Sequence, residues 1–450
     1  MAAAIEAGAD SVYFGIEHLN MRARSSANFT TDDLHTIVAR CKEAGVKTYL
    51  TLNTVMYPED LPLMRTIVDN AKAAGLTAII ASDISVMQYA AEVGVEVHLS
   101  TQLNIANTEA LRFYAQYADV VVLARELNME QVAQIHRDVV EQHIVGRHGE
   151  LIRIEMFCHG ALCMAVSGKC YLSLQNYNSS ANRGACVQVC RRGYTVTDKE
   201  TGMQLDIDNQ YIMSPKDLKT IHFLNKMLDA GVTVLKIEGR ARGADYVKTV
   251  VSCYKEAVEA YVNGEWEPTP GPSLKGGEKG VKELRSEGVK TNVGVAEGVK
   301  ELRTEGVKTI DGEKTIDEKI AEWDERLARV FNRGWWDGYY LGQRLGEWTH
   351  HYGSQATRTK VYVGKVTNYF KNIGVAEFLV EATTVQNGDE FLVTGNTTGA
   401  YEGVFTEIRK DGEIGTTDDP IPQGELFSHK TDKVLHRGDK LYKLKIDNGK

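Results

Sequence analysis

The sequence predicts an α/β fold: a TIM-type (β/α)8 barrel that lacks its first strand, followed by a small C-terminal antiparallel β-barrel. Over residues 1–245, short runs rich in β-branched residues alternate with amphipathic helical patterns, several of which end in glycine. Such alternation indicates a parallel sheet with crossover helices. Over residues 356–450, strand patterns instead follow one another between Asn-Gly and Asp-Gly turns, which is typical of an antiparallel barrel.

Seven strands are expected in the first part of the chain, at 11–15, 46–52, 77–82, 95–100, 120–125, 152–158 and 232–239. A polar or charged residue closes nearly every run: Glu17, Asn53, Asp83, Gln102, Glu126, His159 and Arg240. TIM-type barrels carry such residues at their catalytic rim. Because a closed barrel needs eight strands and the chain opens on a helix-like pattern, we expect one strand to be absent beside residues 11–15.

Four parts are predicted along the chain. They are a barrel (1–265) with a Cys-rich insert at about 160–215, a linker (266–315), a helical connector (316–355) and the small β-barrel (356–450). The linker repeats one motif at 280–291 and 298–309, and two copies are too few to build a solenoid.

Composition excludes several classes of protein. Apolar residues make up 43% of the chain, enough for a large core, and no apolar run reaches the roughly 18 residues of a membrane span. The net charge of −9 means that a nucleic acid would need a local basic patch. No secretory signal is evident and the cysteines number seven, so we expect a reducing, cytoplasmic location without a membrane partner.

Five of the cysteines lie between 158 and 190, and four of them form the pairs Cys163-x6-Cys170 and Cys186-x3-Cys190. Two such pairs of thiolates can bind zinc or an iron–sulfur cluster. The spacing is wider than that of a C-x2-C zinc knuckle and favours the cluster. The alternative is four ordinary buried thiols.

The segment from Cys163 to Tyr194 contains no Asp or Glu. It carries basic and aromatic side chains instead: Lys169, Arg183, Arg191, Arg192, Tyr171, Tyr177 and Tyr194. This basic island could bind phosphates or an acidic small molecule, with tyrosines available for base stacking. Equally, its charges could offset those of cluster-bound thiolates.

Charged residues also recur on the last predicted strand of the barrel. Lys236, Glu238 and Arg240 alternate with period two and therefore share one face. Three charges on a helix-covered outer face would be costly, so we expect them to point inward as a charge network or anion site. Glu155 ends the sixth run and is a candidate acid/base, or else a salt-bridge partner of an Arg near the barrel mouth.

Residues 155–173 read Glu-Met-Phe-Cys-His-Gly-Ala-Leu-Cys, four further residues, then Gly-Lys-Cys-Tyr-Leu-Ser. This stretch resembles the signature of the U32 "peptidase" family at every defined position. Further segments similar to family elements lie at 9–15, 20–29, 98–104, 213–218 and 235–243, and residues 360–378 resemble the β-barrel of one branch. Family members begin with a strand ending in Pro-Ala-Gly that this chain lacks, which agrees with the seven-strand count.

That branch is similar to prephenate-dependent tRNA hydroxylation proteins. The resemblance implies an RNA-modifying enzyme that hydroxylates wobble uridine in tRNA to 5-hydroxyuridine, with tRNA as partner and prephenate as oxygen source. It also implies an iron–sulfur cluster, expected to be 4Fe-4S, whose ligands are Cys163, Cys170, Cys186 and Cys190. Since prephenate is a dicarboxylate, arginine clamps would suit it.

The expected catalytic residues are Glu155, His159, Lys236, Glu238 and Arg240. The expected substrate-binding residues are Arg22, Arg24, Arg183, Arg191, Arg192 and Tyr171.

Three alternatives stay open: a collagenase-type U32 peptidase, hydroxylation of an rRNA cytidine or a ubiquinone precursor, and a binding partner that uses its cluster structurally. The chain has no H-E-x-x-H and no G-x-S-x-G motif. His98 and His159 lie at strand ends, so a cysteine and a histidine could still pair in space. The peptidase hypothesis otherwise depends on the family name.

Overall fold

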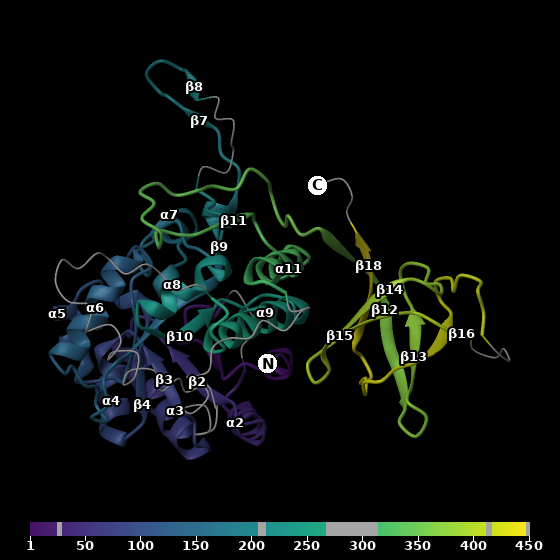
Figure 1. The fold of residues 1–450 in the computed structure, drawn as a ribbon, viewed down its shortest axis with the longest axis horizontal. Helices are drawn as coiled ribbons and strands as arrows, with labels where there is room; N and C mark the ends of the chain where they lie inside the picture. The colour runs from purple at the N-terminus through teal and green to yellow at the C-terminus, as the bar shows by residue number, and fades with distance from the viewer. Residues whose placement is uncertain (25–28, 206–212, 267–313, 411–415, 447–450) are drawn as a thin grey trace.

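A computed structural model of the chain describes residues 1–24, 29–205, 213–266, 314–410 and 416–446 (Figure 1). Within them, a mixed α/β unit built on a parallel sheet is followed by a separate antiparallel sheet. This confirms the predicted α/β class and the change from parallel to antiparallel strands. The predicted linker and its duplication fall almost entirely on 267–313, outside the described residues.

Seven strands of the first sheet run parallel, in the order β1-β2-β3-β4-β5-β6-β10. Their bounds are β1 (Ser11–Phe14), β2 (Lys47–Leu52), β3 (Ala78–Ala81), β4 (Glu96–Leu99), β5 (Val120–Val122), β6 (Arg153–Ala161) and β10 (Val232–Ile237). Two short strands extend the sheet at the far end of β6, namely β9 (Asp217–Lys219), antiparallel to β6, and β11 (Trp335–Trp336), parallel to β9.

The sheet leaves one edge open where the missing strand was expected. Among the described residues, β1 pairs along its length only with β2, and β10 pairs only with β6. Side chains, rather than a backbone ladder, connect the two edges: the Tyr13 hydroxyl donates to the Ile237 carbonyl at 3.1 Å. The parallel sheet is therefore confirmed, whereas a closed TIM barrel is not.

Helices connect successive strands and cover the sheet. They are α2 (Asp33–Glu43), α3 (Leu61–Ala74), α4 (Ile84–Val93), α5 (Thr108–Ala115), α6 (Met129–Glu141), α8 (Leu224–Asp229) and α9 (Ala244–Val262), while α1 (Ala2–Glu6) packs on α9. Each longer helix buries an apolar stripe, as α3 does with Met64, Ile67 and Val68. Gly75 and Gly94 end α3 and α4 in the left-handed conformation, as the sequence predicts.

The Cys-rich insert follows β6. It contains α7 (Leu172–Tyr177) and a two-stranded hairpin of β7 (Val196–Thr197) and β8 (Gln204–Leu205), which projects from the body in Figure 1. Short 3-10 turns occur at Pro58–Asp60, Thr101–Leu103, Ala181–Arg183, Val189–Arg191 and Ile221–Phe223. Helix α11 (Ile316–Ala328) then packs against α9 before the chain reaches the second sheet.

The second sheet is antiparallel throughout, in the order β15-β14-β18-β12-β13-β17-β16. Its strands are β12 (Arg358–Phe370), β13 (Val375–Val380), β14 (Glu390–Gly395), β15 (Gly399–Val404), β16 (Arg409–Lys410), β17 (Leu426–Lys430) and β18 (Lys440–Ile446). Phenylalanines 378, 391, 405 and 427 stack in its core. Lys360 pairs with Asp245 of α9 at 2.9 Å, which ties the two sheets' units together.

None of the helices in the described ranges is both long enough and apolar enough to cross a membrane.

Candidate functional site

A buried ion pair joins the neighbouring strands β6 and β10. The Lys236 ammonium donates to Glu155 Oε1 at 2.7 Å, and the two residues are only 8% and 3% exposed. The second carboxylate oxygen, Glu155 Oε2, is buried and has no hydrogen-bond partner among the described residues. Because an unpaired carboxylate oxygen is a strong acceptor, this atom is available to take a proton from a water molecule or a ligand.

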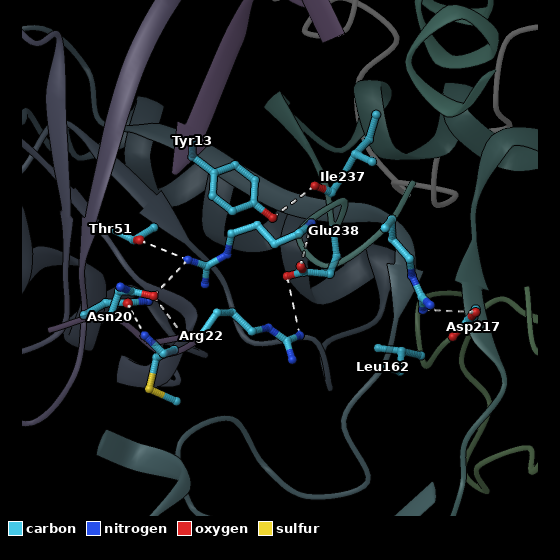
Figure 2. A network of polar contacts seen from close by, with 12 residues as sticks. Tyr13, Asn20, Arg22, Thr51, Leu162, Asp217, Ile237 and Glu238 are labelled. Atoms are coloured by element: carbon cyan, nitrogen blue, oxygen red, sulfur yellow. Dashed lines mark hydrogen bonds and ion pairs between the residues drawn. The ribbon is translucent and has the colours of Figure 1, made fainter. Parts of the chain in front are cut away.

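A second polar group lies at the exit of β10. Arg240 Nη1 donates to Asn20 Oδ1 at 3.3 Å and to Thr51 Oγ1 at 3.2 Å, while Arg22 lies 3.9 Å from the Glu238 carboxylate (Figure 2). The Arg240 Nε atom is buried and has no partner in the part of the chain that the structure describes. Burial lowers the pKa of Arg240, whereas Glu238 raises the pKa of Arg22.

Tyr13 lies between these two groups. Its ring centroid is 4.9 Å from Lys236 Nζ and 5.7 Å from the Arg240 guanidinium, and burial raises its pKa well above the ordinary value. The sequence analysis missed this residue. The sequence did contain a signal that could have identified it. Side chains alternate between the two faces of a strand, so Tyr13 lies on the face opposite Val12 and Phe14.

The structure therefore brings together four of the predicted catalytic residues and one predicted substrate-binding residue: Glu155, Lys236, Glu238, Arg240 and Arg22. It adds Tyr13, Asn20 and Thr51, which come from β1, the loop after it and β2. Cations outnumber carboxylates in this set, so the site can stabilise negative charge on a ligand.

His159 lies apart from this set. Its side chain is fully buried, with Nδ1 3.4 Å from the Tyr254 hydroxyl and its ring 5.0 Å from that of Trp335. Burial lowers its pKa to about 3, so the ring is neutral at ordinary pH.

Cys158 and His98 have other partners. The Cys158 thiol lies against the Lys236 carbonyl, and His98 Nε2 lies against Glu96. Among the described residues, no hydrogen bond joins a cysteine to either predicted histidine, so the possible Cys–His pair is not formed.

The four paired cysteines are free; Cys163 is exposed and the other three are half-buried. They lie close enough to influence one another: burial raises the pKa of Cys190 to about 11, and the thiols of Cys163, Cys170 and Cys186 add to the rise. Within the described ranges, however, no three Cys, His, Asp or Glu side chains are grouped so as to hold a metal ion. The donor chemistry fits an iron–sulfur cluster, and its ligation stays a prediction.

The arginines of the predicted basic island have partners within the protein, most of them outside the island itself. Arg183 forms an ion pair with Asp60 at 2.5 Å and stacks on Tyr57, while Arg192 stacks on Tyr177. Arg191 is turned inward.

Two further predicted binding residues lie at the surface. Arg24 is exposed and its backbone amide donates to the Gly184 carbonyl, and Tyr171 is 72% exposed. Among the described residues, no hydrogen bond or ion pair links the basic island to Glu155 or Lys236.

Comparison with known proteins shows which family the chain resembles. The family model described as "Peptidase family U32" matches residues 1–277. A protein named "Collagenase" from Porphyromonas gingivalis (strain ATCC BAA-308 / W83) is 56% identical over 444 residues, which cover 99% of this chain and 95% of that protein. Another protein named "Collagenase" from Porphyromonas gingivalis is 50% identical over 414 residues, which cover 92% of this chain and 99% of that protein.

A "tRNA hydroxylation protein P1" from Bacillus subtilis is 36% identical over 265 residues, covering 57% of this chain and 60% of that protein. The likeness to the collagenase-named proteins is stronger and extends over nearly the whole chain. The predicted identity as a tRNA uridine hydroxylase is therefore wrong. The binding of tRNA and of prephenate stays a prediction. The predicted family, in contrast, is confirmed, and the chain belongs to peptidase family U32.

Proposed function

We propose that this protein is a peptidase that acts on collagen-type polypeptides. The observation that carries the proposal is the 56% identity over 444 residues to the P. gingivalis protein named "Collagenase". Identity of this extent covers the strands, the insert and the antiparallel sheet together. It therefore favours the peptidase hypothesis, which the motif search alone left as an alternative.

The chemistry of the Glu155–Lys236 site supports hydrolysis by an activated water molecule. In this proposal, Glu155 Oε2 takes a proton from water as the water oxygen bonds to the scissile carbonyl carbon. The C–N bond then breaks, and the proton passes from Glu155 to the leaving amine. Lys236 and Arg240 stabilise the negative charge that develops on the carbonyl oxygen.

Two features favour this arrangement over a thiol nucleophile. Glu155 Oε2 has no partner among the described residues, so no existing hydrogen bond competes for its lone pairs. The Cys158 thiol, by comparison, is buried against a carbonyl, and its burial raises its pKa far from the thiolate range.

Digestion of denatured type I collagen by the purified full-length chain tests the proposal. New amino termini are measured for the native protein, for Glu155→Gln and for the control Lys255→Met, whose side chain pairs with Asp10 on the exterior. Loss of a general base costs about 10²–10⁴-fold in rate, so Glu155→Gln should lose at least about 100-fold while the control keeps its rate. No digestion by the native chain, or equal digestion by Glu155→Gln, would overturn the function or the role of Glu155 respectively.

We also propose two finer features. The curved parallel sheet is a TIM-type barrel with one strand absent, which explains why side chains from β1, β2, β6 and β10 meet at one rim. Cys163, Cys170, Cys186 and Cys190 bind an iron–sulfur cluster, supported by four free thiols in a segment without acidic residues. A bound cluster would supply electron transfer or Lewis acidity, but the hydrolytic steps above use only this chain's own residues.

A further inference from the structure

A second charged group lies beyond the Glu155–Lys236 site, around Asp217 of β9. Asp217 is 2% exposed, and its Oδ1 lies 3.1 Å from Arg333 Nη1. Its Oδ2 accepts from the Arg333 backbone amide at 3.2 Å and lies 3.9 Å from Arg242 Nη2 (Figure 2). One buried carboxylate therefore faces two guanidinium groups.

The positive excess continues from this group to Arg191. Among the described residues, Arg191 donates to neutral partners only, Ser214 Oγ at 3.1 Å and the carbonyls of Leu162 and Pro215. We name the arginine belt as Arg191, Arg242 and Arg333. In the part of the chain that the structure describes, Asp217 is the carboxylate that pairs with these guanidinium groups.

A purely structural role does not account for Arg242. Arg333 alone satisfies both oxygens of Asp217 through its side chain and its backbone. The Cζ atom of Arg242 lies over the Phe331 ring, 3.9 Å from its centroid, and the Arg242 side chain donates no hydrogen bond to another side chain or carbonyl within the described ranges. Stacking occupies the face of a guanidinium and leaves its in-plane N–H groups free to bind a planar anion in two places at once.

The loop after β10 holds its two arginines on different sides. Ala241, between them, has φ 62°, a left-handed conformation that costs free energy for a residue with a Cβ atom. Arg240 contacts Asn20 and Thr51, whereas Arg242 contacts Asp217 and Phe331. The strained backbone thus presents Arg242 next to the Glu155–Lys236 site instead of inside it.

We propose that the arginine belt is a carboxylate-binding subsite for the substrate peptide, with Arg242 as its main contact. The inference depends on the peptidase proposal for the identity of the ligand. A peptide offers this chemistry from two sources, its terminal carboxylate and the side chains of Asp or Glu. The side chains of Arg242 and Arg333 are 12% and 13% exposed, so a ligand can reach them in surroundings where water screens the charge weakly.

Three synthetic peptides of equal length, each built from Gly-Pro-Ala repeats, distinguish the two sources of the carboxylate. The first ends in a free carboxylate, the second in an amide, and the third in an amide with one internal Ala replaced by Glu. Calorimetric titration uses the full-length Glu155→Gln protein, so that no peptide is cleaved, and KM and kcat are measured on the protein with Glu155 intact. We expect one or both carboxylate peptides to bind about tenfold more tightly than the neutral one, the effect of a charge-assisted bidentate contact.

Arg242→Met should abolish the difference in affinity between the carboxylate peptides and the neutral peptide, while the dissociation constant of the neutral peptide stays within about twofold of its value before the substitution. Arg242→Lys should restore only part of the difference, because an ammonium binds a carboxylate at one point. In the active protein, the loss should appear in KM and not in kcat. The control Arg329→Met, an exposed side chain paired with Glu325 on α11, should keep the preference.

Equal binding of all three peptides, or an undiminished preference in Arg242→Met and Arg242→Lys, would overturn the subsite. Failure of the peptidase proposal looks different: the preference for carboxylate and its loss in Arg242→Met would persist although no peptide is hydrolysed.

Discussion

The hydroxyl of Tyr13 in β1 donates to the backbone carbonyl of Ile237 in β10 across 3.1 Å. These two strands lie at opposite ends of the row of seven parallel strands, and no backbone pairing joins them in the described residues. The Tyr13 side chain therefore bridges the open edge of the sheet, next to the Glu155–Lys236 pair.

Tyr13→Phe should destabilise the protein by about 1 kcal/mol, because the part-buried Ile237 carbonyl loses the hydroxyl donor while the ring still packs. Urea unfolding of the full-length chain measures this. Tyr89→Phe is the matched control, since the Tyr89 hydroxyl bonds Asp69 at the exposed surface and its loss should change stability by less than about 0.5 kcal/mol. If Tyr13→Phe unfolds at the same urea concentration as the native chain, the bridge does not stabilise the edge.

Lys236→Met should lower the free energy of unfolding more than a substitution at the surface does. It leaves the Glu155 carboxylate buried without its cation, a situation that costs about 3–5 kcal/mol. Combining Lys236→Met with Glu155→Gln removes the unpaired charge and should recover more than half of the loss. A double-mutant cycle by chemical denaturation checks the coupling, and strictly additive effects would contradict it.

Anaerobic purification should yield a brown protein that contains iron and acid-labile sulfide. Cys163→Ala, Cys170→Ala and Cys186→Ala should each remove most of the iron, because each takes one thiolate from the predicted set. Cys41→Ala, a buried core thiol in α2, should keep it. Iron content unchanged in Cys163→Ala, or a native chain without iron, would reject the cluster.

The buried His159 should make the protein sensitive to acid. Its folded pKa of about 3 lies below the unfolded value near 6.5, so the unfolded state binds the proton more readily. The stabilising effect of the neutral ring is complete above pH 6.5 and is lost progressively as the pH falls toward 3. We expect His159→Gln to flatten the dependence of the unfolding free energy on pH between 6.5 and 4.5.

The exposed His350→Gln serves as the control for that measurement and should leave the dependence unchanged. A native slope that His159→Gln does not alter would place the acid sensitivity elsewhere in the chain.

Local sequence patterns were sufficient to predict the type and order of most elements of the parallel sheet. Alternation of β-branched runs with amphipathic stretches depends on neighbours a few residues apart, and so do glycine helix ends such as Gly75 and Gly94. Period two predicted that Lys236, Glu238 and Arg240 share one face of the last strand. The observed strand β10 ends at Ile237, and Lys236 contacts β6 whereas Arg240, beyond the strand end, contacts β2. The count of seven parallel strands and the open edge beside β1 were predicted from the same patterns.

The predicted function was wrong for a related reason. Residues 155–173 resemble a signature of the U32 family as a whole, so this local motif identified the family without separating its branches. Similarity over 99% of the chain made the distinction.

By itself, the sequence determined the secondary structure, the family and the residue types available for chemistry, because these depend on short-range periodicity and on motifs. Only the tertiary structure decided which charges meet. Tyr13 and Ile237 are 224 positions apart, and Arg183 finds Asp60 from 123 positions away. Such pairings are set by how the strands and loops pack in space. Arg183 has the Asp60 carboxylate as its partner, whereas Arg242 shares the Asp217 carboxylate with Arg333, and only those distant partners distinguish the two arginines.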